Sequence, residues 1–154
     1  SGTPIFDAYM VQLQDFIDAI VAGDHEAAAK DFIKTWGASL AWEYIGIEQR
    51  SAMMQQIDII PAQDGAIFHD NAGMLHPGRL EGLDLPVLLM QGGGSPPIIG
   101  AINRALASRL PNAKIETVSG ASHMLPITHP VQVGQVIGGF LCVEQAQETV
   151  NVFV

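Results

Sequence analysis

The histidine His123 lies in the stretch SGASHMLPITHP (119–130), between a strand-like run, KIETV (114–118), and a proline that can begin a helix. An imidazole exchanges a proton near neutral pH, so a histidine within reach of a serine hydroxyl can act as general base in acyl transfer. A turn after a strand places its side chains at the carboxyl end of a sheet, where α/β proteins bind ligands. His123 is therefore our first candidate catalytic residue, and a polar loop residue is the alternative.

The glycine-rich stretch GGGSPP (92–97) follows a second strand-like run and precedes a helical pattern. Backbone N–H groups in such a loop can bind an anion, as in phosphate-binding loops. The lysine and the spacing of those loops are absent here, and so is the G-x-G-x-x-G pattern of dinucleotide sites. We therefore expect a structural loop, in which Ser95 caps a helix that begins at the prolines.

The remaining histidines have simpler explanations than catalysis. His69, Asp70 and His76 are of metal-ligand types, but their spacing matches no recognised site, so we predict no metal and no cofactor. His129 precedes Pro130, and this pair is explained as the start of a helix.

The composition indicates one globular domain, because 154 residues with 48% hydrophobic content can form a core. Sixteen acidic residues against seven basic ones give a net charge of −9, which opposes binding to nucleic acid and to anionic lipid. The single cysteine, Cys142, cannot form an internal disulfide, and its apolar helical surroundings predict a buried thiol. With no membrane-length apolar run and no signal peptide, we expect a soluble, cytoplasmic protein.

The N-terminal part, residues 4–60, has the apolar spacing of helices. A first helix is predicted to end at Gly23, Asp24 is placed to cap a second, and a third is predicted over Glu48–Ile59. The first face comprises Ile5, Phe6, Tyr9, Leu13, Phe16, Ile17, Ile20 and Val21, the second Ala27, Ala28, Phe32, Ile33 and Trp36, and the third Met53, Met54 and Ile57. Packing is the expected role of these faces.

Residues 61–83 are predicted to form a long loop with at most one short helical turn. The stretch 61–79 carries three glycines and two prolines and shows no clear period. Loops of this length are uncommon in compact domains and usually serve as lids, as binding loops, or as segments that rest on another part of the protein.

Residues 84–154 are predicted to form a parallel β-α-β-α unit. The order is a strand (86–91), the glycine loop, a helix (98–110), the strand 114–118, the histidine turn and a final helix from Pro130 to about Gln145. The residues of the crossover helix expected to face the sheet are Ile98, Ile102, Ala105, Leu106 and Leu110.

Three stretches of this unit, LDLPVLLMQGGGSPP, RLPNAKIETVSGASHMLPITHP and VGQVIGGFL, resemble the last two strands and the last helix of an α/β-hydrolase. The upstream FIDAIVAGDHEAAAKDFIKTWGAS is similar to the helical cap that such enzymes insert before those strands. The resemblance implies an α/β fold, namely a partial α/β-hydrolase with an N-terminal helical cap (4–60) followed by the β-α-β-α unit. It also implies that His123 matches the general base of the family.

Other parts of the family's machinery have no match in this chain. The G-x-S-x-G nucleophile elbow and the oxyanion-hole loop are absent. The family often carries its acid just after the strand that matches Val87 to Met90, yet no carboxylate occurs between Asp84 and Glu116. Asp64 and Asp70 in the long loop are alternatives for the acid, and Asp64 is preferred.

Two functions are consistent with these residues. The first is hydrolysis of an ester or related bond in a small apolar substrate, with the nucleophile supplied by an upstream segment or a second chain. The residues expected to line its substrate pocket are Met53, Met54, Phe68, Met74 and Met124. The alternative is a truncated, non-catalytic hydrolase domain that binds a small molecule or another protein as a dimer.

The two predicted strands also imply a partner. Parallel strands are normally buried on both faces within larger sheets, and a free strand edge favours pairing with another chain. We therefore expect either a homodimer or association with a nucleophile-bearing N-terminal segment.

Overall fold

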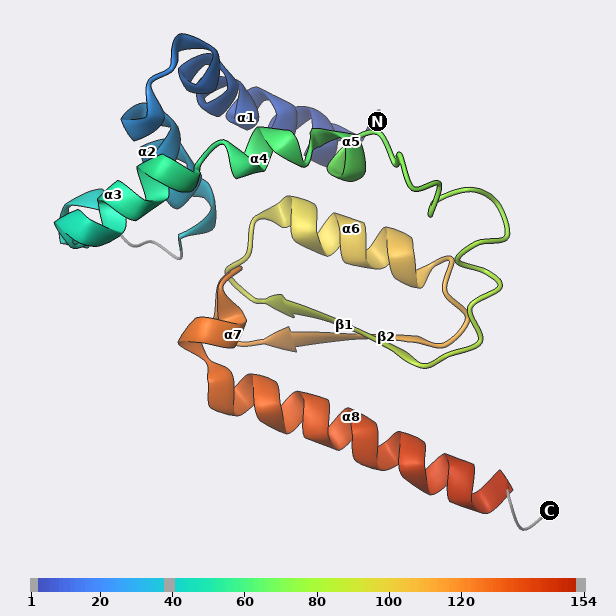
Figure 1. Cartoon of the computed structure of the whole chain (residues 1–154). Coiled ribbons are helices and arrows are strands. Elements are labelled where there is room, and N and C mark those ends of the chain that lie inside the picture. Colours follow the sequence, from blue (N-terminus) through green and yellow to red (C-terminus); the bar gives the residue numbers. More distant parts are fainter. Residues whose placement is uncertain (1–2, 38–40, 152–154) are drawn as a thin grey trace.

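The computed structural model describes residues 3–37 and 41–151, and in the second range the side chains up to Cys142. The N-terminal part is helical, and a small parallel sheet with its own helices follows, so the described chain is mixed α/β (Figure 1). The elements are α1 (Pro4–Ala22), α2 (His25–Trp36), the 3-10 turn η1 (Trp42–Tyr44), α3 (Ile47–Gln56), α4 (Ile59–Ala62), α5 (Asp64–Ile67), β1 (Val87–Gly92), α6 (Pro97–Ala107), β2 (Ala113–Val118), α7 (Leu125–Thr128) and α8 (Pro130–Asn151).

Local capping sets the ends of α1 and α2. Gly23 has a φ of 71° in the left-handed region and donates its N–H to the last carbonyls of α1, which is the usual glycine termination. Asp24 Oδ1 accepts the Ala27 N–H at 2.9 Å and so satisfies a free donor of α2. The predictions for Gly23 and Asp24 are confirmed.

The N-terminal helices enclose one hydrophobic core, whose buried members are Phe16, Ala28, Ala29, Ile33, Trp42, Ile45 and Ile57. Met53 and Met54 pack against this core as predicted. Val21, predicted on the inner face of α1, is instead 83% exposed. At 100° per residue Val21 lies about 140° around the helix from the buried Phe16, beyond the margin of the apolar stripe.

The predicted helix over Glu48–Ile59 is divided in two, because α3 ends at Gln56 and α4 begins at Ile59. Pro61 has no N–H to give to the Ile57 carbonyl, and its ring disfavours a regular helix at that position. The Ile57 carbonyl accepts the Ile60 N–H instead, at 3.1 Å, which makes a tighter turn.

The two strands pair in parallel with the register Val87↔Ala113 to Gly92↔Val118. Helix α6 makes the crossover between them and lies on one face of the sheet, and α8 lies on the other face (Figure 1). Both strands lie within one residue of their predicted positions. Among the described helices, none combines the length and the apolar content that crossing a bilayer requires.

The buried face of α6 differs from the prediction. Ile102 is 46% exposed and Ala105 is also exposed, whereas the polar Asn103 is buried. The Asn103 side-chain amide donates to the Met90 carbonyl at 3.4 Å and to Gln91 Oε1 at 3.2 Å. A polar residue can occupy this face because its hydrogen-bonding groups are satisfied by β1, and apolar spacing alone does not reveal this.

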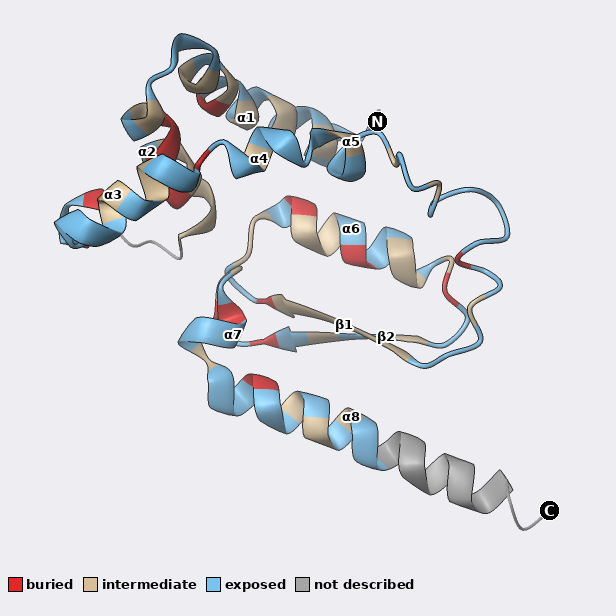
Figure 2. Cartoon of the chain, viewed as in Figure 1, coloured by how far each residue is buried: buried red, intermediate tan, exposed pale blue. Residues whose placement is uncertain are grey.

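Helix α8 contacts the sheet mainly near its start. A second core cluster comprises Val118, Ala121, Leu125 and Val133, with Met90 packed against it. Exposed positions predominate along the described part of α8 (Figure 2). Cys142 is exposed, so the prediction of a buried thiol is wrong, because the apolar contact of α8 does not extend to that turn.

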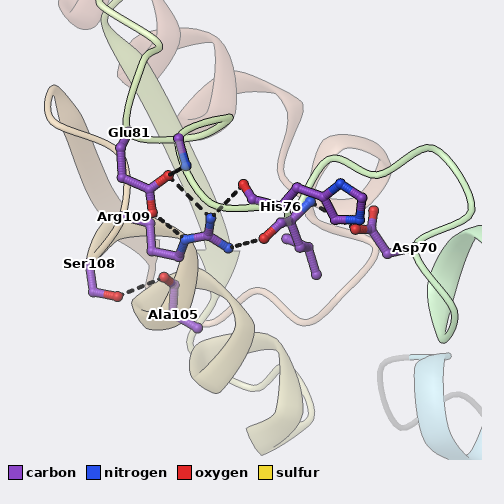
Figure 3. Close-up of polar contacts among 8 residues, drawn as sticks. Asp70, His76, Glu81, Ala105, Ser108 and Arg109 are labelled. Atoms are coloured by element: carbon purple, nitrogen blue, oxygen red, sulfur yellow. Dashed lines mark hydrogen bonds and ion pairs between the residues drawn. The ribbon is translucent and has the colours of Figure 1, made fainter.

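Arg109, just after α6, holds the long loop in place (Figure 3). Its guanidinium pairs with Glu81 at 2.7 Å and donates to the Leu75 and His76 carbonyls at 2.8 and 3.2 Å. Glu81 also accepts the Gly78 N–H at 2.9 Å. The loop after α5, predicted as irregular, is thereby attached to the end of the crossover helix.

The Glu81 carboxylate should make this attachment sensitive to acid. The hydrogen bond from Arg109 lowers the Glu81 pKa from 4.5 to about 2, with help from the backbone. Because the pKa of Glu81 is lower in the folded than in the unfolded chain, the ionised carboxylate stabilises the fold above pH 4.5. This stabilisation is lost as pH falls from 4.5 towards 2. We expect Glu81→Gln to lower the unfolding midpoint temperature at pH 7, and this difference from wild type to vanish near pH 2. Glu48→Gln, at an exposed position on α3, is the control; an equal effect of both variants would contradict the assignment.

Candidate functional site

The loops after β1 and β2 meet at one edge of the sheet. The Gly93 N–H donates to the Val118 carbonyl at 2.9 Å, and the Gly94 N–H donates to the Ala121 carbonyl at 2.8 Å. The glycine loop and the histidine turn lie together there because the two parallel strands end at the same edge. This is the position at which α/β folds build their sites.

Close packing at this edge depends on Gly92, the last residue of β1. A Cβ at Gly92 would collide with the carbonyl oxygens of Ala121 and Ser122. The turn that carries His123 therefore rests directly on the backbone of β1. Gly120, which opens the turn, has a φ of 77° in the left-handed region.

The N–H groups of the glycine loop already have partners. Ser95 Oγ accepts the Gly92 N–H at 3.1 Å, and the Ser95 N–H donates to the Gly92 carbonyl at 3.0 Å. The N–H groups of Gly93 and Gly94 are hydrogen-bonded as well, so the loop has no set of free N–H donors that could bind an anion. The prediction that Ser95 caps α6 is wrong: Pro96 is the N-cap residue, and the Ser95 hydroxyl turns back to β1.

The His123 imidazole lies against a side chain from the N-terminal helices. Its ring centroid is 4.7 Å from that of Trp36, the last residue of α2, with the two planes tilted by 57°. Trp36 in turn makes an edge contact with Tyr9 of α1, at 6.1 Å between centroids. Half-burial lowers the His123 pKa below its usual 6.5, which favours the neutral imidazole that a general base requires.

Ser122, the neighbour of His123, has a buried hydroxyl oxygen with no hydrogen-bond partner among the described residues. Such an unpaired group is unusual in a folded chain, because its burial costs free energy. Ser122 lies on the turn after β2 rather than on a strand-to-helix elbow, so it does not match the position of a hydrolase nucleophile.

Asp64, the preferred acid, pairs with another histidine. Its carboxylate lies 3.0 Å from His69 Nε2, and both side chains are more than half exposed. Among the described residues no carboxylate is hydrogen-bonded or ion-paired to His123. Asp70, the other candidate acid, is used by its own loop, because its two oxygens accept the N–H groups of Met74 and Leu75 at 2.8 and 2.9 Å.

The five predicted substrate-lining residues do not form one group. Met124 follows His123 directly and is 38% exposed at the candidate site, whereas Phe68 and Met74 lie exposed on the long loop. Met53 lines a separate pocket of about 150 Å³ between α2, α3 and α4, and Met54 packs on the nearby core. The other residues around this pocket are Ala29, Phe32, Ile33, Gln56, Ile57, Ile59 and Ile60.

Trp36 is the member of the site that sequence reasoning assigned only to packing. It belongs to the apolar stripe of α2, and its partner His123 is distant in sequence, so periodicity carries no sign of the contact.

Within residues 3–37 and 41–142, no three histidine, cysteine or carboxylate side chains lie together as metal ligands would. Comparison of the chain with protein-family models, curated proteins and solved structures found no match.

Proposed function

We propose that this chain provides the cap and the general base of an α/β-hydrolase-type site that cleaves an ester or related bond in a small apolar substrate. The observation that carries the proposal is the position of His123. Its half-buried imidazole lies on the turn at the carboxyl edge of two parallel strands, against Trp36 from the N-terminal helices. A covered histidine on such an edge has the location and the protonation state of a general base.

In this proposal His123 moves a proton twice. An imidazole nitrogen takes the proton of a serine hydroxyl while the serine oxygen bonds to the substrate carbonyl carbon. The same proton then passes to the leaving oxygen as the ester bond breaks, which leaves the acyl group on the serine. In the second round the imidazole takes a proton from water as the water oxygen bonds to the acyl carbon, and gives it to the serine oxygen as the acyl-serine bond breaks. Met124 beside His123 and the apolar surface of the cap suit an uncharged substrate, and the net charge of −9 disfavours an anionic one.

The nucleophile in this proposal comes from outside the described residues. Among these, β1 pairs only with β2, so its other edge can accept a further strand. A nucleophile-bearing segment paired to β1 would bring its own strand-to-helix turn to the edge that carries His123, because parallel strands end at the same edge. A separate second chain that carries such a segment is the other candidate for that position.

Fluorophosphonate labelling tests the proposal. We expect the isolated chain to remain unlabelled, because a base without its nucleophile and oxyanion donors loses most of the rate enhancement. The native assembly, purified through a tag on this chain, should be labelled on a serine outside these 154 residues and should hydrolyse p-nitrophenyl butyrate. The mass of that assembly distinguishes a segment attached to this chain from a separate chain bound to it.

The contrary outcomes are clear. Stoichiometric labelling of the isolated chain would place the nucleophile within it, with Ser122 the first residue to replace by alanine. A native assembly that is neither labelled nor active would favour the second candidate, a non-catalytic module. The observation that favours that candidate is the pocket lined by Met53 and Phe32, whose volume suits a molecule of about the size of benzene.

A further inference from the structure

The contact between Trp36 and His123 joins two parts of the molecule that are far apart in sequence. Trp36 ends α2 in the N-terminal helical region, and His123 lies on the turn after β2. The ring centroids are 4.7 Å apart, which is direct van der Waals contact for two aromatic rings. The His123 imidazole therefore contacts the N-terminal helical region (the cap, residues 4–60) through the Trp36 indole.

Trp36 is itself held from several sides. Tyr9 of α1 packs edge-on against the indole, and Gln12 Nε2 of α1 donates to Thr35 Oγ1 at 3.1 Å next to it. After Trp36 the chain turns at Gly37, whose N–H donates to the Ile33 carbonyl at 2.8 Å. The position of the indole is thus determined by the packing of α1 on α2 rather than by the histidine turn.

Neighbouring charges do not account for the state of His123. The titratable groups on the neighbouring elements are Asp7, Tyr9, Asp15 and Asp18 on α1, His25, Glu26, Lys30, Asp31 and Lys34 on α2, and His129 after α7. None of these forms a hydrogen bond or ion pair with the imidazole in the described structure. Burial is the cause of the lowered His123 pKa, and the aromatic ring beside it is Trp36.

We propose that Trp36 is a positioning residue for His123: its indole fixes the orientation of the imidazole and excludes water from one side of the ring, so that the cap controls the base. This inference rests on the proposed function for its catalytic meaning. The contact also couples cap docking to proton binding. Since burial lowers the His123 pKa, docking is favoured above pH 6.5 and weakened as pH falls below it.

Two effects of the indole on the pKa of His123 oppose each other. Exclusion of water disfavours the charged imidazolium and lowers the pKa, whereas an aromatic face attracts a cation and raises it. The 57° tilt keeps the imidazole from stacking flat on the indole face, and within residues 3–37 and 41–142 no carboxylate pairs with the imidazole to stabilise the cation. Water exclusion is therefore the larger effect, and removal of the indole should raise the pKa of His123 towards 6.5.

NMR titration of the imidazole signals in the chain as it stands tests this inference. Trp36→Leu is expected to raise the pKa of His123 and to let its two ring nitrogens exchange protons with water more rapidly. Trp36→Phe, which keeps an aromatic ring in place, should restore most of the wild-type behaviour. The signals of His76 on the long loop should be the same in all three proteins, and circular dichroism shows whether each is folded.

The results separate this inference from the proposed function. An unchanged His123 titration in folded Trp36→Leu, or a fall in its pKa, would overturn the positioning role whatever the protein catalyses. If Trp36→Leu does not fold, the test uses Trp36→Phe and the rate at which the His123 imidazole exchanges protons with water. This rate should lie within about twofold of the wild-type rate, and a larger increase would contradict the expectation that an aromatic ring at this position is sufficient. The NMR titration does not require an active enzyme. Its result can therefore be interpreted even if the fluorophosphonate experiment shows no labelling.

Discussion

Replacing His123 by glutamine in the active native assembly is expected to lower kcat for p-nitrophenyl butyrate by about 10⁴-fold or more, the loss that follows removal of the base from a serine triad. Glutamine preserves the approximate size of the side chain but cannot take a proton. The loss should therefore fall mainly on kcat, with KM changing little. Steady-state kinetics of the two proteins, purified in the same way, measure it.

His76→Gln is the matched control for this substitution. His76 is exposed on the long loop, and its backbone carbonyl rather than its ring accepts the Arg109 hydrogen bond. We expect this variant to retain wild-type kcat and KM. Retention of activity in His123→Gln as well would remove the general base from the proposed mechanism.

Gly92→Ala is expected to destabilise the fold by about 3 kcal/mol, at the upper end of the cost of overpacking a close contact. A methyl group at Gly92 meets the carbonyl oxygens of Ala121 and Ser122, which are backbone atoms and cannot rotate away. The histidine turn must then move off β1. Urea unfolding of the variant and the wild type, followed by circular dichroism, measures the difference.

Gly93→Ala provides the comparison for this prediction. A Cβ at Gly93 lies 3.7 Å from its nearest neighbour, the Val118 carbonyl oxygen, which is ordinary contact. This substitution should change stability by no more than about 0.5 kcal/mol. Equal losses in Gly92→Ala and Gly93→Ala would show that flexibility of the loop, and not the close approach of the turn, requires glycine at these positions.

Features that depend on neighbouring residues were predictable. The end of α1 at Gly23 and the cap of α2 at Asp24 follow from backbone freedom and from hydrogen bonds that reach only three or four residues. The βαβ order and the parallel pairing follow from apolar strands separated by one helix. These elements form because short-range hydrogen bonding and apolar periodicity favour the same local structure.

Predictions of which side chains are buried were less accurate. Asn103 is buried on α6 while Ile102 is exposed, because β1 offers hydrogen-bond partners to an amide. Cys142 is exposed because α8 packs on the sheet mainly near Val133. Ser95 bonds to the end of β1 rather than to α6. In each case the outcome depends on the position of a second element, which periodicity does not contain.

The sequence by itself determined that His123 follows a strand and lies on the same edge as the glycine loop, because parallel strands joined by one crossover helix end together. Only the tertiary structure decided what surrounds it. Trp36 reaches the imidazole because α2 packs on α1, which in turn contacts the crossover helix α6, and Asp64 lies against His69 instead. Such contacts join residues far apart in the chain, and their geometry is set by how whole helices pack, which the pattern within any one segment does not specify.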